Sequence, residues 1–281
     1  MIGYFVYKLG EFLASLFPLP IAYKIGNFFA TLQFLVSKKD RQAVIRNLEL
    51  ILPQEEKATA KKRAREVFVN FGLYLAEFFR YKKIDKNFVQ SRVALEGLEH
   101  VEDCLKSGKG GILLTAHLGN WELGGMALGL LGYPIVAIAL DHKNKKINEF
   151  FKVRRESKGV GNISLGLAIK QCFRALKQNK LVAILGDRDF SKSGYELDFL
   201  GKTKIIPRGP AVLALHLGSP IVPVFVIREP NKHVVMRFLQ PILFDANTEE
   251  KELVRRYATI IEDHIRQYPT QWLMFREFWK E

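Results

Sequence analysis

A histidine and a glutamate lie five residues apart in the stretch TAHLGNWE, residues 115–122. The apolar run 110–116 before it predicts a buried strand, and the residues from 121 to 131 have the pattern of a helix. His117 is therefore expected at the carboxyl end of a sheet, where open α/β folds bind their ligands. A carboxylate that holds one imidazole nitrogen fixes the tautomer and raises the basicity of the other nitrogen. His117 and Glu122 thus predict removal of a proton from an alcohol that attacks a thioester.

The residues between the two side chains indicate how they would meet. Asn120 suits the N-cap of the helix, and Glu122 then falls in its first turn, where the helix dipole favours an ionised carboxylate. With His117 in the loop and Glu122 on the helix, we expect the two side chains to converge. The alternative is a histidine that caps a helix beside a solvated glutamate, because H-x-x-x-x-E is a short pattern.

The elements that would position this pair change in character along the chain. Residues 1–92 have helical periodicity throughout, and we expect them to form a helical, membrane-associating region. Residues 93–281 alternate short apolar runs with helical stretches, which predicts an α/β domain with a mostly parallel central sheet flanked by helices. The predicted strands are 110–116, 135–140, 181–185, 195–200 at an edge, 221–227 and 234–239.

The first 36 residues are the most apolar of the chain and have a Pro-Leu-Pro corner at 18–20. The longest uncharged run, 25–37, is shorter than the roughly 20 residues of a spanning helix. We expect two short helices in the plane of the membrane interface, followed by Lys38, Lys39 and Arg41 facing anionic headgroups. The alternative is that these helices only pack on the core.

Composition restricts the class of protein. The net charge of +14 favours a polyanionic partner, and the combination of apolar and basic segments favours an anionic membrane over nucleic acid, for which no recognition motif is present. Cys104 and Cys172 are far apart among apolar neighbours and predict reduced core thiols. No C-x-x-C occurs and the six histidines are scattered, so neither a metal nor a cofactor is expected.

Several segments together resemble a known family. The block TAHLGNWELGG resembles the catalytic H-x-x-x-x-E block of the lysophospholipid acyltransferase superfamily, in its bacterial lipid A biosynthesis (lauroyl/myristoyl) branch. Further segments follow in family order and cover nearly the whole chain: Arg46-Asn47-Leu48, Glu77 in an E-x-x-R-like helix, Arg155 to Gly159, Gly186 to Asp189, Phe199 to Gly201, Pro207 to Ala211, and Pro220 to Pro223.

The resemblance implies a fold, an activity and a set of roles. The fold would be that of glycerol-3-phosphate acyltransferase, and His117 would be the general base with Glu122 as its partner. Arg155 or Arg154 would hold an acceptor phosphate or polarise the thioester, since arginine suits oxyanions. The positions implied to bind substrate are Asn120, Arg154, Arg155, Asp187, Arg188, Gly201 and Arg208.

The implied reaction moves a fatty-acyl chain from acyl carrier protein or coenzyme A to a hydroxyl of a membrane glycolipid, a lipid A precursor in the first place. Basic helices at 57–65 and 143–158 would dock the acidic carrier or anionic lipid at the cytoplasmic face of the inner membrane, with the protein peripheral or monotopic.

The acceptor stays open because Asp187-Arg188-Asp189 stands where lipid A acyltransferases usually have Asp-Gln. That block resembles the phosphatidylinositol mannoside acyltransferases of the same superfamily, and a lysophospholipid is a further alternative. A non-catalytic lipid-binding protein with the same fold is the alternative from another class.

Overall fold

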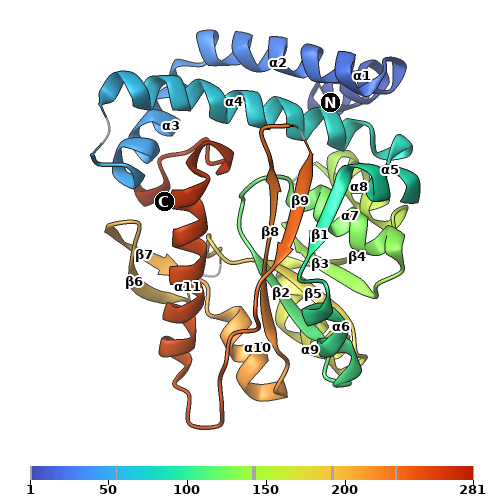
Figure 1. Cartoon of the computed structure of the whole chain (residues 1–281), viewed down its shortest axis with the longest axis vertical. Helices are drawn as coiled ribbons and strands as arrows, with labels where there is room; N and C mark the ends of the chain where they lie inside the picture. Colours follow the sequence, from blue (N-terminus) through green and yellow to red (C-terminus); the bar gives the residue numbers. More distant parts are fainter. Residues whose placement is uncertain (1, 55, 141–143, 191–192, 232, 281) are drawn as a thin grey trace.

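A computed structural model describes the chain except for residues 1, 55, 141–143, 191–192, 232 and 281. The basic stretch predicted from residue 143 therefore begins outside the described residues. Five α-helices and one short 3₁₀ helix precede the first strand in the described residues, and the first, second and fourth α-helices lie together across one end of the molecule (Figure 1). The five α-helices are α1 (Ile2–Leu16), α2 (Leu19–Val36), α3 (Lys38–Ile51), α4 (Lys57–Phe79) and α5 (Lys86–Arg92).

A seven-stranded sheet forms the centre of the rest of the chain, in the order β1-β9-β8-β2-β5-β3-β4. All its neighbouring strands are parallel except β8 and β9, so the predicted fold class is confirmed. The strands are β1 (Val93–Glu96), β2 (Gly111–Thr115), β3 (Ile135–Ala139), β4 (Gly161–Ser164), β5 (Leu181–Leu185), β8 (Ile221–Arg228) and β9 (Val234–Phe238).

Helices cover both faces of this sheet. Alternate residues of its strands point to opposite faces and pack in two different apolar clusters. In β2, Ile112 and Leu114 pack in one cluster with α9 (Ala168–Lys177), α10 (Gly209–Leu217) and α11 (Glu250–Gln267). Leu113 packs in the other with α6 (Glu99–Lys106), α7 (Trp121–Leu131) and α8 (Lys145–Glu156). Strands buried on both faces read as continuous apolar runs, which is why β2, β5 and β8 could be predicted.

The predicted edge strand 195–200 forms instead half of a separate antiparallel hairpin, β6 (Tyr195–Phe199) with β7 (Lys202–Ile206). The short strands β1 and β4 were not predicted; each has only four residues and lacks a long apolar run. Strand β1 begins at Val93, where the sequence predicts the second domain to begin. The division into residues 1–92 and 93–281 stays a prediction, since α4 also packs against the short C-terminal helix η3 (Pro269–Gln271).

Helix α2 runs antiparallel to α4 at very close range, because glycines face each other at the crossing. A Cβ on Gly72 would lie 2.6 Å from the carbonyl oxygen of Gly26, and one on Gly26 would lie 2.7 Å from that of Gly72. Further along, Phe34 packs edge-on against Phe68. The two helices are therefore fixed side by side, as small residues allow.

The opposite sides of α1 and α2 are exposed and apolar. Large apolar side chains are exposed along both helices: Phe5, Leu9, Phe12, Leu16, Ile21, Phe28, Phe29, Leu32, Leu35 and Val36. Helix α2 is also long and apolar enough to cross a membrane, by length and composition alone. An apolar surface of this size is typical of a contact with a membrane or a protein.

Both cysteines are buried and neither forms a disulfide. Burial raises the pKa of the Cys104 thiol to about 11 and that of Cys172 to about 12. The thiolate is the reactive form, so both thiols are expected to stay protonated and inert at mildly alkaline pH. Iodoacetamide followed by mass spectrometry should label neither cysteine in the folded protein and both after unfolding in urea.

The exposed Ser91 on α5 provides a control position. In Ser91→Cys the introduced thiol should be alkylated in the folded protein under the same conditions. Labelling of Cys104 or Cys172 at the rate of that reporter would contradict their buried, protonated state.

Candidate active site

His117 lies in the loop between β2 and α7, at the carboxyl end of the central strand β2. The main chain of this loop forms hydrogen bonds with β8 on one side and with the C-terminal segment on the other. The amide of Asn120 donates to the carbonyl of Val226 in β8 (2.9 Å), and the amide of Gly119 donates to the carbonyl of Gln271 (2.9 Å). The carbonyl of His117 accepts from the amide of Leu273 (2.8 Å). The loop is thus held between the sheet and the C-terminal segment.

Gly119 is required for this close fit. Its φ is +66°, and a Cβ at this position would lie 1.8 Å from the carbonyl oxygen of Val226. Any other residue would push the loop away from β8, because neither the φ value nor the space allows a side chain. The loop then enters α7 through Asn120, whose side chain accepts from the amide of Leu123 (3.1 Å). Asn120 is the N-cap expected from the sequence.

The imidazole of His117 has a buried carboxylate as its partner, but that carboxylate is Asp187. The ring nitrogen Nδ1 lies 2.8 Å from Oδ1 of Asp187, which follows β5, and the amide of His117 donates to Oδ2 (3.1 Å). The indole N–H of Trp272 also donates to Oδ2 (3.1 Å). Asp187 is 0% exposed. Burial raises the pKa of this carboxyl, but the charge and hydrogen bonds of His117 and the bond from Trp272 outweigh it, so the pKa is lowered.

This geometry favours one tautomer of His117. An ionised Asp187 accepts a hydrogen bond from Nδ1–H, which keeps the proton on Nδ1 and leaves the lone pair of Nε2 available as a base. The ring of Trp121 stands edge-on to the imidazole, with the ring centres 5.1 Å apart. The His117 side chain is partly exposed, so a substrate can reach it. The arrangement can therefore accept a proton from a hydroxyl group.

Glu122 does not hold the imidazole as the sequence suggested. Its carboxylate binds Arg155, whose Nε donates to Oε2 (3.0 Å) and whose terminal nitrogen donates to Oε1. Arg155 also donates to the side-chain oxygen of Asn162 (3.3 Å). Burial lowers the pKa of the Arg155 guanidinium, but Glu122 outweighs it and raises the pKa. A guanidinium matches a carboxylate with two parallel hydrogen bonds, which explains why Glu122 turns toward α8.

Arg154, the alternative to Arg155 in the sequence, points to another part of the molecule. It is 3% exposed and donates to Oε2 of Glu11 in α1 (2.6 Å) and to the carbonyl of Phe150 (2.6 Å). Glu11 also pairs with Lys8 and Lys82. Arg154 therefore joins α1 to α8, and its buried ion pair leaves it poorly placed to bind an acceptor phosphate.

The other positions implied by the resemblance make contacts within the chain. The guanidinium of Arg188 lies over the ring of Phe190, 4.8 Å from its centre. Gly201, with φ +84°, is in the turn between β6 and β7. Arg208 precedes α10 and pairs with Glu250 (2.6 Å). Their substrate-binding roles stay predictions.

A second buried carboxylate, Glu77 of α4, holds the N-cap of α7 from the side of the helical region. It is 1% exposed, and its Oε2 accepts from the side chain of Asn120 (2.6 Å) and from Arg228 of β8 (2.6 Å). Its Oε1 accepts from the hydroxyl of Tyr23 in α2. Glu77 thus connects α2, the sheet and the loop that carries His117.

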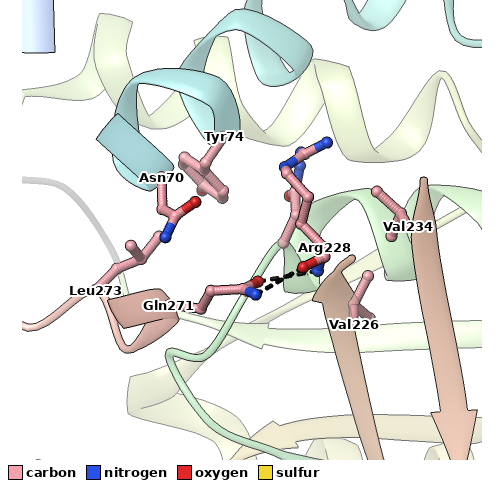
Figure 2. A pocket seen from close by; sticks show the side chains of 9 residues that line it. Asn70, Tyr74, Val226, Arg228, Val234, Gln271 and Leu273 are labelled. Atoms are coloured by element: carbon pink, nitrogen blue, oxygen red, sulfur yellow. Dashed lines mark hydrogen bonds between the residues drawn. The ribbon is translucent and has the colours of Figure 1, made fainter. Parts of the chain in front are cut away.

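A small cavity lies beside this network, between α4, β8, β9 and the C-terminal segment (Figure 2). Gln271 closes one side by pairing with the main chain of Arg228, through bonds of 2.9 and 2.8 Å. The cavity has a volume of about 10 Å³, which is roughly the space of one water and excludes an acyl chain. It is lined by Asn70, Tyr74, Gly119, Asn120, Val226, Arg228, Val234, Gln271 and Leu273.

The C-terminal segment is the part of the site that sequence reasoning missed. Trp272 of this segment donates a hydrogen bond to Asp187. Asn47 of α3 holds the segment in place. Its side chain donates to the carbonyls of Met274 (3.2 Å) and Arg276 (2.7 Å) and accepts from the amide of Phe278 (3.1 Å). Residues 272–279 are rich in aromatic side chains, but nothing in their local sequence indicates that Asp187 is a partner.

Together, the fold and the imidazole–carboxylate pair at the end of β2 have the chemistry expected of an enzyme that activates a hydroxyl group. The chain belongs to the family of bacterial lipid A biosynthesis acyltransferases, which it matches over residues 1–281, and it is an acyltransferase.

Relatives with two kinds of acceptor in their names are similar to it at low identity. A phosphatidylinositol mannoside acyltransferase of Mycolicibacterium smegmatis is 24% identical over 265 residues, which cover 93% of this chain and 86% of the relative. The lipid A biosynthesis palmitoleoyltransferase of Escherichia coli is 23% identical over 270 residues, 94% and 86% of the two chains. The lipid A biosynthesis lauroyltransferase of Escherichia coli is 22% identical over 269 residues, with the same coverage.

The partner of the imidazole can be tested by substitution. In Asp187→Asn the amide would donate to Nδ1 and shift the His117 proton to Nε2, whereas Glu122→Gln should leave the proton on Nδ1. Nitrogen-15 spectra of histidine-labelled protein report the tautomer, with His117→Gln used for assignment. If Glu122→Gln moves the proton and Asp187→Asn does not, the pairing suggested by the sequence is the correct one.

The Glu77 network predicts a large loss of stability on removal of its charge. Glu77→Gln keeps the shape but leaves the largely buried Arg228 without its carboxylate, which should cost about 3–5 kcal/mol. Glu252→Gln is the control, because Glu252 pairs with Arg255 and Arg256 on the surface of α11, where solvent screens the charges, and its loss should change stability little. Thermal unfolding measures both, and equal shifts would contradict the role of Glu77.

Proposed function

We propose that this acyltransferase moves a fatty-acyl chain from an acyl thioester to a hydroxyl of a membrane glycolipid, with a lipid A precursor as the first candidate acceptor. The observation that carries the proposal is the His117–Asp187 pair at the carboxyl end of β2, in a chain that matches its family over its whole length. A base with a fixed tautomer suits direct transfer between two bound substrates.

In the proposed step, Nε2 of His117 takes the proton of the acceptor hydroxyl while that oxygen attacks the thioester carbonyl. The new carbon–oxygen bond gives a tetrahedral intermediate, which collapses with cleavage of the carbon–sulfur bond. The proton on Nε2 then passes to the leaving thiolate, so that the imidazole returns to its neutral state. Asp187 stabilises the transient imidazolium through the bond to Nδ1.

In this proposal, Glu122 supports the site indirectly, through its ion pair with Arg155. The ion pair joins the first turn of α7 to α8 beside the loop that carries His117. Burial and the nearby Glu122 charge raise the pKa of Tyr74 well above its ordinary value, so Tyr74 stays protonated next to the pair. Arg155 keeps the expected oxyanion-binding role only if a substrate oxygen shares its guanidinium with Glu122.

A mannosylated inositol lipid is the second candidate acceptor. Phosphatidylinositol mannoside acyltransferases of two mycobacterial species are 24% and 26% identical to this chain. The Asp187-Arg188-Asp189 block, read from the sequence, points the same way. Both candidates are sugar-containing membrane lipids, so the proposed step at His117 is common to them.

The donor and the place of reaction also belong to the proposal. Acyl carrier protein is acidic, and the basic helix α8 offers Lys145, Lys146 and Lys152 to it or to coenzyme A. The exposed apolar sides of α1 and α2 would lie in the membrane interface, with the protein peripheral or monotopic at the cytoplasmic face of the inner membrane.

A transfer assay tests the function. The purified chain is offered a radiolabelled acyl group, carried as a thioester on acyl carrier protein or on coenzyme A. The acceptor is lipid A precursor, phosphatidylinositol mannoside or lysophospholipid in mixed micelles. His117→Ala should lower the rate about 10²–10⁴-fold with one of these acceptors, since it removes the general base. His216→Gln on the outer helix α10 is the control and should keep the parental rate.

Each outcome decides between hypotheses. The acceptor that is turned over identifies the substrate class. Equal rates for His117→Ala and the parent would remove His117 from the mechanism. A folded protein that binds vesicles but acylates none of the acceptors would contradict the proposal and support the lipid-binding alternative.

A further inference from the structure

A larger pocket lies at the corner where α2 begins, among α2, the end of α4, the short helix η1 (Tyr81–Lys83) and α5. Its volume is about 140 Å³, roughly ten times the space that a single water needs. The lining residues are Leu19, Glu77, Arg80, Lys83, Ile84, Phe88 and Arg92. None of the residues that bond to His117 lines this pocket.

The pocket is strongly basic. Arg80, Lys83 and Arg92 contribute three positive charges, and Arg80 is only 8% exposed. The hydrogen bonds of Arg80 go to the carbonyls of Ala14 and Phe17, at the corner between α1 and α2. In the described part of the chain, neither Lys83 nor Arg92 pairs with a carboxylate.

The acidic groups around the pocket are already occupied. Glu77 in its wall accepts from Tyr23, Asn120 and Arg228. The nearby Asp85 caps α5 by accepting from the amide of Phe88 (2.8 Å). The pocket therefore keeps an excess of positive charge beside a partly buried guanidinium, which is the chemistry that binds a phosphate.

The position of the pocket indicates the source of the phosphate. The corner that Arg80 holds is flanked by the exposed apolar side chains of Phe12 and Leu16 in α1 and Ile21 in α2. Inside the pocket, Leu19, Ile84 and Phe88 add apolar contacts beside the cations. A basic pocket with an apolar wall, at the edge of an exposed apolar surface, matches a lipid headgroup whose acyl chains continue into a membrane.

We propose that this pocket binds the phosphate of an anionic membrane phospholipid between Arg80, Lys83 and Arg92, with the glycerol and first acyl carbons against Leu19, Ile84 and Phe88. The lipid would anchor the α1–α2 corner to the bilayer at a defined headgroup. This inference goes beyond the proposed transfer reaction, because it assigns a site for a lipid that is not the acceptor bound at His117.

Vesicle flotation of the full chain tests the site. Vesicles of phosphatidylcholine alone are compared with vesicles that contain a minority of phosphatidic acid. In Lys83→Gln/Arg92→Gln, binding to the anionic vesicles should fall roughly tenfold or more, since each basic residue near an anionic surface contributes on the order of 1 kcal/mol. Binding to phosphatidylcholine should stay at the parental level, because the apolar sides of α1 and α2 are unchanged.

Lys38→Gln/Lys39→Gln is the matched control. It removes the same charge from exposed positions after the other end of α2. A general electrostatic attraction would weaken both double variants equally, and that result would overturn the proposal. A clearly larger loss in Lys83→Gln/Arg92→Gln would support a specific pocket.

Inorganic phosphate separates the lipid from a soluble anion. Thermal shifts are measured with inorganic phosphate for the parent and Lys83→Gln/Arg92→Gln. If phosphate stabilises the parent through these residues while vesicle binding is unaffected by their loss, the pocket holds a soluble anion and the lipid assignment is wrong. Arg80→Gln removes the charge at the corner, so a folded Arg80→Gln protein with parental binding to the anionic vesicles would remove Arg80 from the site.

Discussion

The site depends on the burial of one carboxylate. Asp187 is fully enclosed, and an ionised group in such a place costs several kcal/mol unless donors compensate it. Its donors are the amide and ring of His117 and the indole of Trp272, which come from the loop after β2 and from the C-terminal segment. The imidazole cannot turn away without leaving a buried charge short of a partner. The requirement that stabilises the fold here therefore also sets the tautomer of the His117 imidazole.

Glu77 applies the same constraint on the other side of the loop. Its carboxylate accepts hydrogen bonds from Tyr23 of α2, from Arg228 of β8 and from Asn120, the N-cap of α7. Buried ionic groups of this kind contribute little net stability compared with apolar packing, but they penalise every arrangement in which a partner is missing. Helices α2 and α4 are thus joined to the start of α7 by hydrogen bonds that tolerate few alternative positions.

The sequence predicted what local interactions determine. Strand β2, helix α7 and the Asn120 cap follow from an apolar run, helical spacing and a side chain that competes for the first amides of a helix. The partner of His117 could not be predicted in this way, because Asp187 lies seventy residues later and reaches the imidazole only through the parallel pairing of β2 with β5. Spacing favoured Glu122, which the guanidinium of Arg155 takes instead. The family block was informative about position, whereas the hydrogen bonds within it depend on tertiary structure.

The carboxyl end of α4 contacts two separate parts of the molecule, the N-cap of α7 and the end of α1. Glu77 lies in the last turn of α4, and Arg80 is the residue that caps the carboxyl end of this helix. Glu77 turns toward the cap of α7, and Arg80 turns toward the free carbonyls at the end of α1, where a cation is favoured by the helix dipole. The close approach of Gly26 to Gly72 brings α2 near enough for Tyr23 to bond Glu77. A larger side chain at either glycine would push α2 away from α4. The hydroxyl of Tyr23 would then move away from Glu77, and Leu19 would move away from the other residues of the basic pocket.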